Sequence, residues 1–363
     1  MQIGCTKKLL DYLKIQAVPV DTAIDPLFSW SANMIMVNQR RTIVVSNDAS
    51  RYAFILYGIK RGDVKNIEIL LLEGVRACLE TMCFAPSIIE QYFQDCGEQV
   101  TFSKTANRSV VAGLNNVCEH AYFFFNRYSP EVLLQRQVIR YLNTNFLTVK
   151  TTEGSGYVHI SDKFSSDIEQ KYGQPLFRCK AAVFDVDLEL DSTCHRRVLI
   201  PLNCTFREFH NVLQTLFGWL NHHLHDFWIE RHPNGRLKYT LTGFPREFEE
   251  EGETTKDDSL VFLHDVFPQY REIIYNYDFG DSWIVHIRLH EIVDDYDKNH
   301  PVCLDWEGEA PPEDVGGRYG YAELLGILKN PEDPEYKDMM EWYRGSRHQL
   351  FDLGYVNRRL RNW

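Results

Sequence analysis

The sequence predicts an α+β fold in two α+β domains, the C-terminal one a mixed or antiparallel sheet with helices packed on one side. Apolar residues alternate over 183–190, as in a strand with one buried face. Residues 205–208 read T-x-x-E, a helix-capping sequence, and apolar residues follow at helical spacing up to Gly218. A hairpin followed by a helix that packs on it is an α+β unit.

The length predicts more than one domain, because 363 residues exceed what a single hydrophobic core usually serves. The hydrophobic and charged fractions, 44% and 25%, are those of an ordinary globular protein. We expect an α+β domain over residues 1–128, a helix and linker over 129–173, and a second α+β domain over 174–363.

In the N-terminal half, strand and helix patterns are separated by polar, glycine- and proline-bearing turns. In order, the expected elements are a strand at 1–5, a helix at 7–13, strands at 29–37, 42–46 and 52–57, helices at 63–82 and 87–93, a strand at 100–103, and helices at 107–118 and 129–142. Residues 151–171 are polar and weakly periodic, which predicts a linker or a packing extension of the domain.

In the C-terminal half, two strands precede the capped helix, and strand and helix patterns then alternate with acidic loops. The expected elements are strands at 181–190 and 196–202, a helix at 205–217, a short helix at 260–266, a strand pair around 273–289, helices beginning at 319 and 331, and a closing segment at 357–360.

The stretch 275–283, Tyr-Asn-Tyr-Asp-Phe-Gly-Asp-Ser-Trp, is the most informative part of the sequence. It reads as strand, tight turn and strand, with a break at Gly280. Asp278 and Asp281 would sit at the mouth of that turn, flanked by the aromatic Tyr277 and Trp283. Carboxylates on a stiff turn are candidate site residues, but ordinary turns also use them to bond their own backbone.

A histidine-rich segment follows the helix expected at 205–217. On an extended strand His223 and His225 share a face, and Asp226 points to the other. Imidazoles at this spacing bind zinc and other divalent ions in some proteins. The candidate metal ligands are therefore His223, His225, Asp278 and Asp281. The alternative is a strand entry whose histidines bond backbone groups.

Charge and cysteine content exclude several classes of protein. Residues 174–363 hold 21 Lys and Arg against 34 Asp and Glu, a balance of −13 that disfavours general nucleic-acid binding. The nine cysteines follow no C-x-x-C pattern, which argues against a disulfide framework or a cysteine zinc site. The apolar runs are too short to span a bilayer and the N-terminus lacks a signal-peptide pattern, so we expect no membrane association and a cytoplasmic location.

The N-terminal half resembles the uncharacterised DUF6933 domain family over about its first 125 residues. The resemblance depends on Cys-Thr-Lys-Lys-Leu-Leu at 5–10, Trp-x-Ala-Asn at 30–33, and Lys-Thr-x-Asn-Arg-Ser-Val at 104–110. This family supplies no activity.

From about residue 176 onward the sequence resembles the plasmid pRiA4b ORF-3-like family, also described as transposon passenger proteins. The motifs are His-Leu-His-Asp-Phe at 223–227, Tyr-Asp-Phe-Gly-Asp-Ser-Trp at 277–283, Pro-Pro-Glu-Asp-Val-Gly-Gly at 311–317, and Val-Asn-Arg-Arg-Leu at 356–360. The resemblance implies an α+β fold and an association with mobile elements, but no reaction. It also brings Glu313 and Asp314 into the candidate site. Family members often carry Trp-x-His after the aspartates, whereas here the histidine falls one residue later, at His286.

Two functions fit these observations. The first is a non-catalytic binding or regulatory module with an acidic, aromatic-lined groove for a protein or peptide partner, which is favoured over nucleic acid. Its aromatic residues would be Trp219, Phe227, Tyr277, Trp283, Trp306 and Tyr319. The second is a nuclease-like hydrolase that depends on a divalent metal, held by the histidines and carboxylates above together with Glu313 and Asp314. A DNA-binding role ranks last, because no helix carries a basic recognition face.

Overall fold

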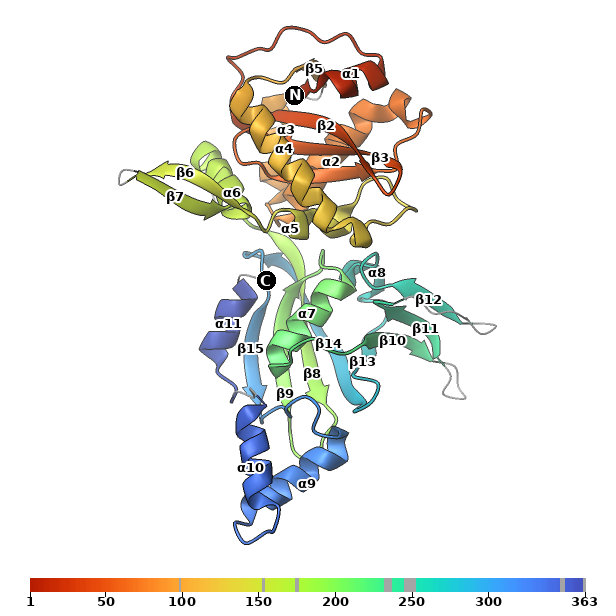
Figure 1. Cartoon of the computed structure of the whole chain (residues 1–363), viewed down its shortest axis with the longest axis vertical. Helices are drawn as coiled ribbons and strands as arrows, with labels where there is room; N and C mark the ends of the chain where they lie inside the picture. Colours follow the sequence, from red (N-terminus) through yellow and green to blue (C-terminus); the bar gives the residue numbers. More distant parts are fainter. Residues whose placement is uncertain are drawn as a thin grey trace. The chain divides into compact units, whose positions relative to one another are not determined.

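The computed structural model describes residues 1–97, 99–151, 154–173, 176–231, 237–244, 253–346 and 350–361 (Figure 1). The chain divides into two compact units, Met1–Arg178 and Cys179–Trp363. Each unit combines helices with a sheet, which confirms the predicted α+β class. Among the described residues, no helix combines the length and the apolar character needed to cross a membrane.

The first unit is built on a mixed sheet. Its strands are β1 (Gln2–Cys5), β2 (Ser29–Val37), β3 (Arg40–Asn47), β4 (Ala53–Tyr57) and β5 (Thr101–Lys104). They lie in the order β4-β3-β2-β1-β5. Strand β1 is parallel to β2 and to β5, whereas β2, β3 and β4 are antiparallel neighbours.

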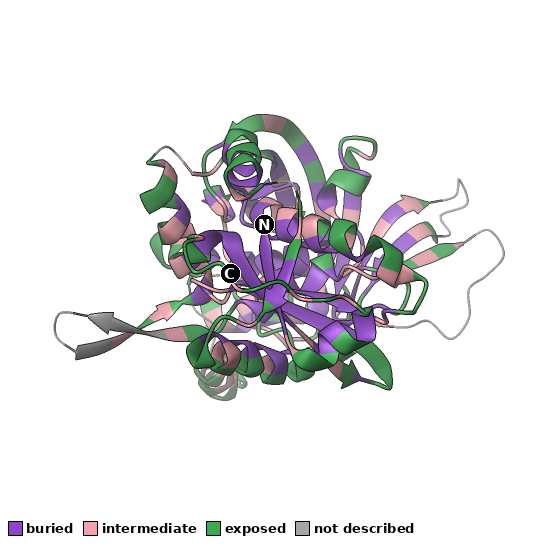
Figure 2. Cartoon of the chain, turned by 90° about the horizontal axis from the view of Figure 1, so that it is seen from above, coloured by how far each residue is buried: buried purple, intermediate pink, exposed green. Residues whose placement is uncertain are grey.

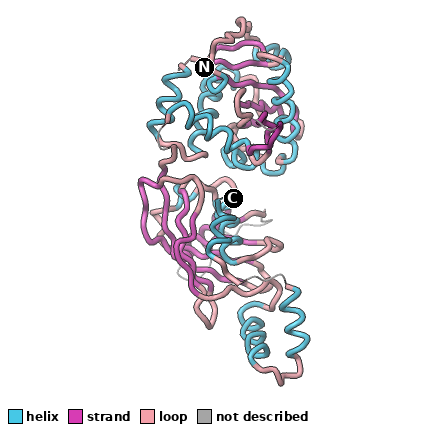
Figure 3. Tube along the Cα trace, turned by 90° about the vertical axis from the view of Figure 1, so that its left-hand side faces the viewer, coloured by secondary structure: helices cyan, strands magenta, loops and turns pink. Residues whose placement is uncertain are grey.

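Helices cover both faces of this sheet (Figure 3). They are α1 (Lys7–Leu13), α2 (Ile67–Thr81), α3 (Pro86–Cys96), α4 (Arg108–Phe123), α5 (Ile139–Leu142) and α6 (Ile160–Tyr172), with 3-10 turns at Pro26–Phe28, Asp63–Asn66, Phe125–Arg127 and Arg136–Val138. Successive side chains of a strand point to opposite faces. Ile43 and Phe54 accordingly pack with Leu71 of α2, while Val44 packs with Leu114 of α4 on the other face.

The segment 129–173 differs from the helix and linker predicted for it. The expected helix at 129–142 is reduced to a 3-10 turn and α5, because the buried Gln135 side chain bonds the backbone of Ser129 through both its oxygen (2.8 Å) and its nitrogen (2.9 Å). The expected linker contains a hairpin of β6 (Phe146–Thr151) and β7 (Gly154–His159), followed by α6. Phe164 of α6 is fully buried and stacks on Tyr52, so this helix belongs to the core of the first unit.

The second unit is built on a long sheet. Its strands are β8 (Cys179–Leu188), β9 (His195–Pro201), β10 (His225–Arg231), β11 (Leu237–Thr242), β12 (Thr254–Asp257), β13 (Glu272–Tyr277), β14 (Trp283–Tyr296) and β15 (Val302–Glu307). They lie in the order β12-β11-β10-β13-β14-β8-β9-β15. Only the pairing of β11 with β12 is parallel among the described strands of this sheet.

Helices α7 (Phe206–Phe217) and α11 (Leu353–Arg361) pack on one face of this sheet, as predicted. The predicted capping box is present, since Thr205 Oγ1 accepts from the N–H of Glu208 and the Glu208 side chain accepts from the N–H of Thr205. Gly218 ends α7 with φ of 70°. The remaining helices are α8 (Leu263–Val266), α9 (Gly317–Lys329) and α10 (Tyr336–Gly345). In Figure 2 the buried residues gather on the strands and on the inner sides of the helices.

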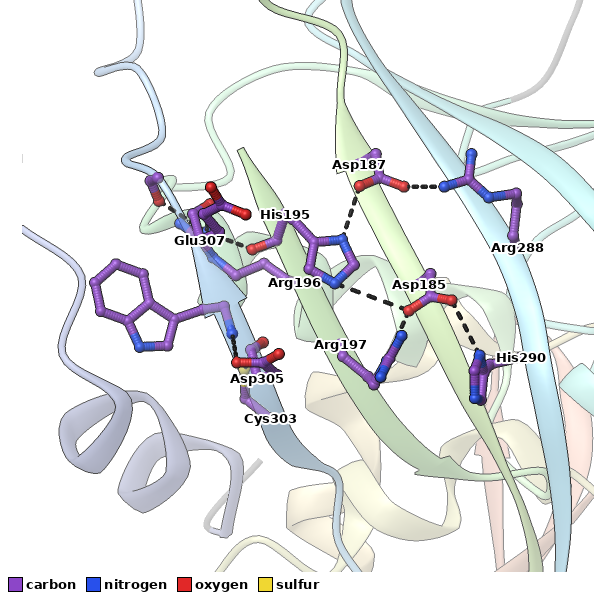
Figure 4. A network of polar contacts seen from close by, with 12 residues as sticks. Asp185, Asp187, His195, Arg196, Arg197, Arg288, His290, Cys303, Asp305 and Glu307 are labelled. Atoms are coloured by element: carbon purple, nitrogen blue, oxygen red, sulfur yellow. Dashed lines mark hydrogen bonds and ion pairs between the residues drawn. The ribbon is translucent and has the colours of Figure 1, made fainter. Parts of the chain in front are cut away.

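Charged side chains form a network on the opposite face of β8, β9 and β14 (Figure 4). Asp185 of β8 pairs with Arg197 of β9 at 2.7 Å and with His290 of β14 at 3.2 Å. Burial alone would raise the pKa of Asp185, but the hydrogen bond and charge of Arg197 outweigh it and hold that pKa below its usual value. Two residues further along β8, Asp187 contacts His195 at 2.7 Å. The cost of taking these charges out of water opposes the packing of a helix over this part of the face.

Candidate metal centre

The turn between β13 and β14 holds the first candidate carboxylate in a fixed conformation. Asp278 adopts a left-handed backbone with φ of 57°, and its Oδ1 accepts from the N–H of Gly280 at 3.0 Å and of Asp281 at 3.4 Å. One carboxylate oxygen therefore does what turn aspartates ordinarily do. The other oxygen, Oδ2, lies 3.6 Å from His223 Nε2.

The second candidate carboxylate of the turn joins it to the loop before α9. Asp281 Oδ2 accepts from the N–H of Gly316 at 3.2 Å. Gly317 approaches so closely, with φ of 68°, that a Cβ there would lie 2.5 Å from the carbonyl oxygen of Asp281. Only glycine fits this position without displacing one of the two segments. Asp281 thus sets the position of the loop that carries Asp314.

Tyr277 connects the same loop to the histidine segment. Its hydroxyl donates to Glu313 Oε1 and accepts from the N–H of His222 at 3.1 Å. Burial, together with the neighbouring Glu313 carboxylate, raises the pKa of Tyr277 above its ordinary value, so the phenol stays a donor. The indole of Trp219 adds a bond to the carbonyl of Pro311 at 3.2 Å.

These bonds bring three side chains from three separate motifs together. His223 Nε2 lies 3.2 Å from Asp314 Oδ1, and one ligand atom each from His223, Asp278 and Asp314 lies within 4.8 Å of the other two. In the described part of the chain, His223 Nε2 and Glu313 Oε2 are enclosed and lack a partner with hydrogen-bond geometry. The Asp278 side chain is 10% exposed and that of Asp314 is 71% exposed, so the cluster reaches the surface. One imidazole and two carboxylates are a ligand set for divalent ions.

His225 lies in a separate network and not with the cluster. It begins β10, and its Nε2 is 2.8 Å from Asp258 Oδ2. His223 precedes the strand, so the strand rule that would give the two histidines one face does not apply to it. The next residue, Asp226, is buried and pairs in register with Asn276 of β13. The shifted histidine, His286, lies 3.5 Å from Glu189.

The network around His225 is buried and polar. Asp258, fully buried, receives Arg207 at 2.8 Å as well as His225. The His210 ring stacks on His225 with centroids 3.6 Å apart. His210 also bonds the hydroxyl of Tyr275 and the side-chain oxygen of Asn221, both at 2.7 Å. Sequence reasoning missed Arg207, His210 and Asp258, because no spacing along the chain links them.

The aromatic residues predicted to line a groove are mostly part of the core. Trp219, Phe227, Tyr277 and Trp283 are between 0% and 4% exposed and pack under α7, whereas Trp306 and Tyr319 are exposed. The prediction of an aromatic-lined groove is therefore wrong for these four side chains. Phe227, Tyr277 and Trp283 lie on the sheet face that the helices cover, and Trp219, which follows α7, stacks on Tyr277. Transfer of their apolar area from water favours that arrangement.

The comparisons with known proteins agree with this organisation. The model of the plasmid pRiA4b ORF-3-like protein family matches residues 180–359, and the chain belongs to this family. A domain of unknown function, DUF6933, matches residues 2–159.

Two further proteins are similar to part of this chain. The chain is 32% identical over 149 residues to the uncharacterized protein y4hQ of Sinorhizobium fredii, which amounts to 40% of this chain and 72% of that relative. It is also 30% identical to a protein of unknown function from Methanosarcina mazei Go1, for which a crystal structure is known. That match covers 50% of this chain and 98% of the other chain, with a TM-score of 0.42.

Proposed function

We propose that residues 174–363 form a binding module whose ligand is a divalent metal ion held by His223, Asp278 and Asp314. The observation that carries this proposal is the convergence of one ligand atom from each residue within 4.8 Å. His223 Nε2 has no hydrogen-bond partner among the described residues, so the tautomer with its proton on Nδ1 offers the Nε2 lone pair to a cation.

The residues around the three ligands support the same proposal. Asp278 Oδ1 and Asp281 accept hydrogen bonds from backbone N–H groups, which fixes the orientation of both side chains. Tyr277 holds Glu313 through its Oε1, while Glu313 Oε2 has no partner in the described chain. Such outer partners orient metal ligands, and their loss usually weakens metal binding.

The test uses tag-free protein, because a histidine tag binds the same ions. Elemental analysis of the purified protein is followed by calorimetric titration with Mn²⁺ and Zn²⁺. We expect one ion per chain, and we expect His223→Gln to lose it. His222→Gln is the matched control, since the exposed neighbour contributes no atom to the cluster. An absence of binding, or equal binding by both variants, would contradict the proposal.

A second candidate is hydrolysis of a phosphodiester or amide with that ion. Its support is that three protein ligands leave coordination positions on the ion open for a substrate, as in catalytic zinc sites. One of these ligands, Asp314, is largely exposed, so a substrate can reach the ion. A divalent ion bound there would supply Lewis-acid polarisation of a phosphoryl or carbonyl oxygen. Turnover of bis(p-nitrophenyl) phosphate that requires Mn²⁺ and disappears in His223→Gln would establish it. Metal binding without turnover of this ester or of a peptide amide would leave a non-catalytic module.

The acidic character of the second unit supports a basic protein or peptide as the partner of this module and disfavours nucleic acid. The family is named after an open reading frame of a plasmid, which supports an association with mobile elements. A cytoplasmic location fits the nine cysteines, since none of them forms a disulfide among the described residues. A pull-down with and without Mn²⁺, compared between the native chain and His223→Gln, tests whether partner binding depends on the ion.

A further inference from the structure

A cavity of about 210 Å³ in the second unit is lined by the end of α7, by the segment before α11 and by α11 itself. It exceeds the roughly 150 Å³ of an engineered apolar cavity that binds benzene, so one substituted ring fits into it. The three residues of the candidate metal cluster are not among its lining residues. The cavity is therefore a feature separate from that cluster.

The charged side chains that line this cavity compensate one another. Two are arginines, Arg196 and Arg359, and two are carboxylates, Glu309 and Asp352. Arg196 is 1% exposed, and its Nε and Nη1 already donate to backbone carbonyls (Figure 4). Glu309 and Asp352 each accept from a backbone N–H. An ionic ligand would lose its water there without gaining a free counter-charge, so the lining disfavours anions and cations alike.

Large apolar side chains surround the mouth of the cavity. Leu220, Leu350 and Tyr355 line it and are 45%, 70% and 43% exposed. The rings of Phe217 and Phe351 line it as well. A ligand with an apolar body would remove part of this exposed apolar area from water, which is the main driving force for binding in such sites.

The last turn of α7 supplies hydrogen-bond acceptors to the same cavity. Thr215, Leu216 and Phe217 line it, and Gly218 caps the helix behind them. The last carbonyls of a helix have no partner within the helix. The carbonyl of Leu216 accepts from Arg196 at 3.1 Å, whereas those of Thr215 and Phe217 accept no hydrogen bond from the described residues. These carbonyls, at the negative end of the helix dipole, favour a ligand that donates a hydrogen bond.

We propose that this cavity binds a small uncharged ring compound that carries a hydrogen-bond donor, of the class of the indoles and phenols. The volume admits one such ring, and the apolar rim takes it out of water. The compensated charges exclude ionic ligands, and the carbonyls at the end of α7 accept the N–H or O–H of the ring compound.

The test titrates the full chain with indole and phenol, with EDTA present to keep metal ions out of the cluster. Benzoate and benzylammonium are the charged controls, and 1-methylindole lacks the donor. Ligand-observed NMR gives the dissociation constants. We expect indole or phenol to bind at millimolar concentration, about tenfold more tightly than either ion, and indole about fivefold more tightly than 1-methylindole, as one hydrogen bond implies. Binding of neither ring compound, or equal affinity for an ion or for 1-methylindole, would overturn the proposal.

Two matched variants locate the binding. Leu220→Ser removes an apolar side chain from the rim and should weaken the binding of indole about threefold or more, because less apolar area leaves the water. Leu304→Ser is the control, since Leu304 is 46% exposed, as Leu220 nearly is, but does not line the cavity. Both side chains lie at the surface, so neither change should disturb the fold. Equal affinities of the two variants would refute the assignment to this cavity.

Discussion

His223 and His225 are two residues apart in the sequence, but their side chains lie in different surroundings. The imidazole of His225 lies in a network where Asp258, Arg207 and its stacked neighbour His210 account for the polar atoms around it. The imidazole of His223 faces two carboxylates, and its Nε2 lacks a hydrogen bond among the described residues. A buried polar group that is fully bonded stabilises the fold. One with spare coordinating capacity at the surface is available to a ligand. Within one motif, His225 is thus part of the interior, and His223 is the histidine that we propose as a metal ligand.

The largest effect on stability is expected in the buried network around His225. Asp258→Ala leaves the buried His225 and the half-buried Arg207 without their shared partner, which should cost about 3–5 kcal/mol of unfolding free energy. Urea denaturation measures it. Asp294→Ala, which removes an exposed carboxylate paired with Lys180 at 3.4 Å, should cost less than about 1 kcal/mol. Similar losses from the two variants would show that the network does not stabilise the unit.

The same network predicts an acid-sensitive fold. Burial, and then the neighbouring His225, lowers the pKa of His210 to about 3. In the unfolded chain this histidine has a pKa of about 6.5, so below that pH it binds a proton that the folded chain does not bind. The free energy of unfolding therefore falls as the pH drops below about 6.5, by up to about 1.4 kcal/mol per pH unit.

Urea midpoints between about pH 6 and pH 4.5 measure this slope, above the range in which carboxylates dominate. His210→Gln should flatten it, because glutamine cannot take up the proton. His222→Gln, a change at an exposed histidine outside the network, should leave the slope in place. A slope that persists unchanged in His210→Gln would assign the acid sensitivity to other groups.

A smaller effect is expected where the turn meets the loop before α9. Gly317→Ala forces a Cβ against the Asp281 carbonyl at positive φ and should cost about 2 kcal/mol. It should also weaken metal binding, because Asp314 shifts with the loop. Gly326→Ala, within the same helix and with no atom within 4 Å of the new Cβ, should stabilise it by about 0.5–1 kcal/mol. Thermal denaturation of both variants checks the difference in sign.

The smallest effect on stability, with a clear effect on binding, is expected at Asp278. Asparagine tolerates the left-handed backbone and keeps an oxygen for the turn amides, so Asp278→Asn should change stability by less than about 1 kcal/mol. Loss of the ligand charge should reduce Mn²⁺ affinity at least about tenfold. Calorimetric titration provides the affinity. An unchanged affinity would remove Asp278 from the ligand set and leave the turn a purely structural device.

Local signals in the sequence predicted much of the fold. Alternation marked β8, the T-x-x-E sequence and Gly218 marked both ends of α7, and the break at Gly280 marked the turn after β13. These signals depend on residues a few positions apart, which is why they can be read without tertiary structure. The segment 129–135 was misread as helix because its apolar residues have helical spacing, while the deciding contact is the Gln135 side chain.

The α+β class, the family and the residue types that could hold a metal can all be read from the sequence. Which of these residues lie close together depends on the folded chain. Asp314 joins His223 and Asp278 because Asp281 and Tyr277 bond the loop that carries it. His225 and the aromatic residues Trp219 and Trp283 belong to the interior. The reason is physical: a ligand set depends on distances between atoms far apart along the chain, and those distances are set by packing and long-range hydrogen bonds that no local pattern encodes.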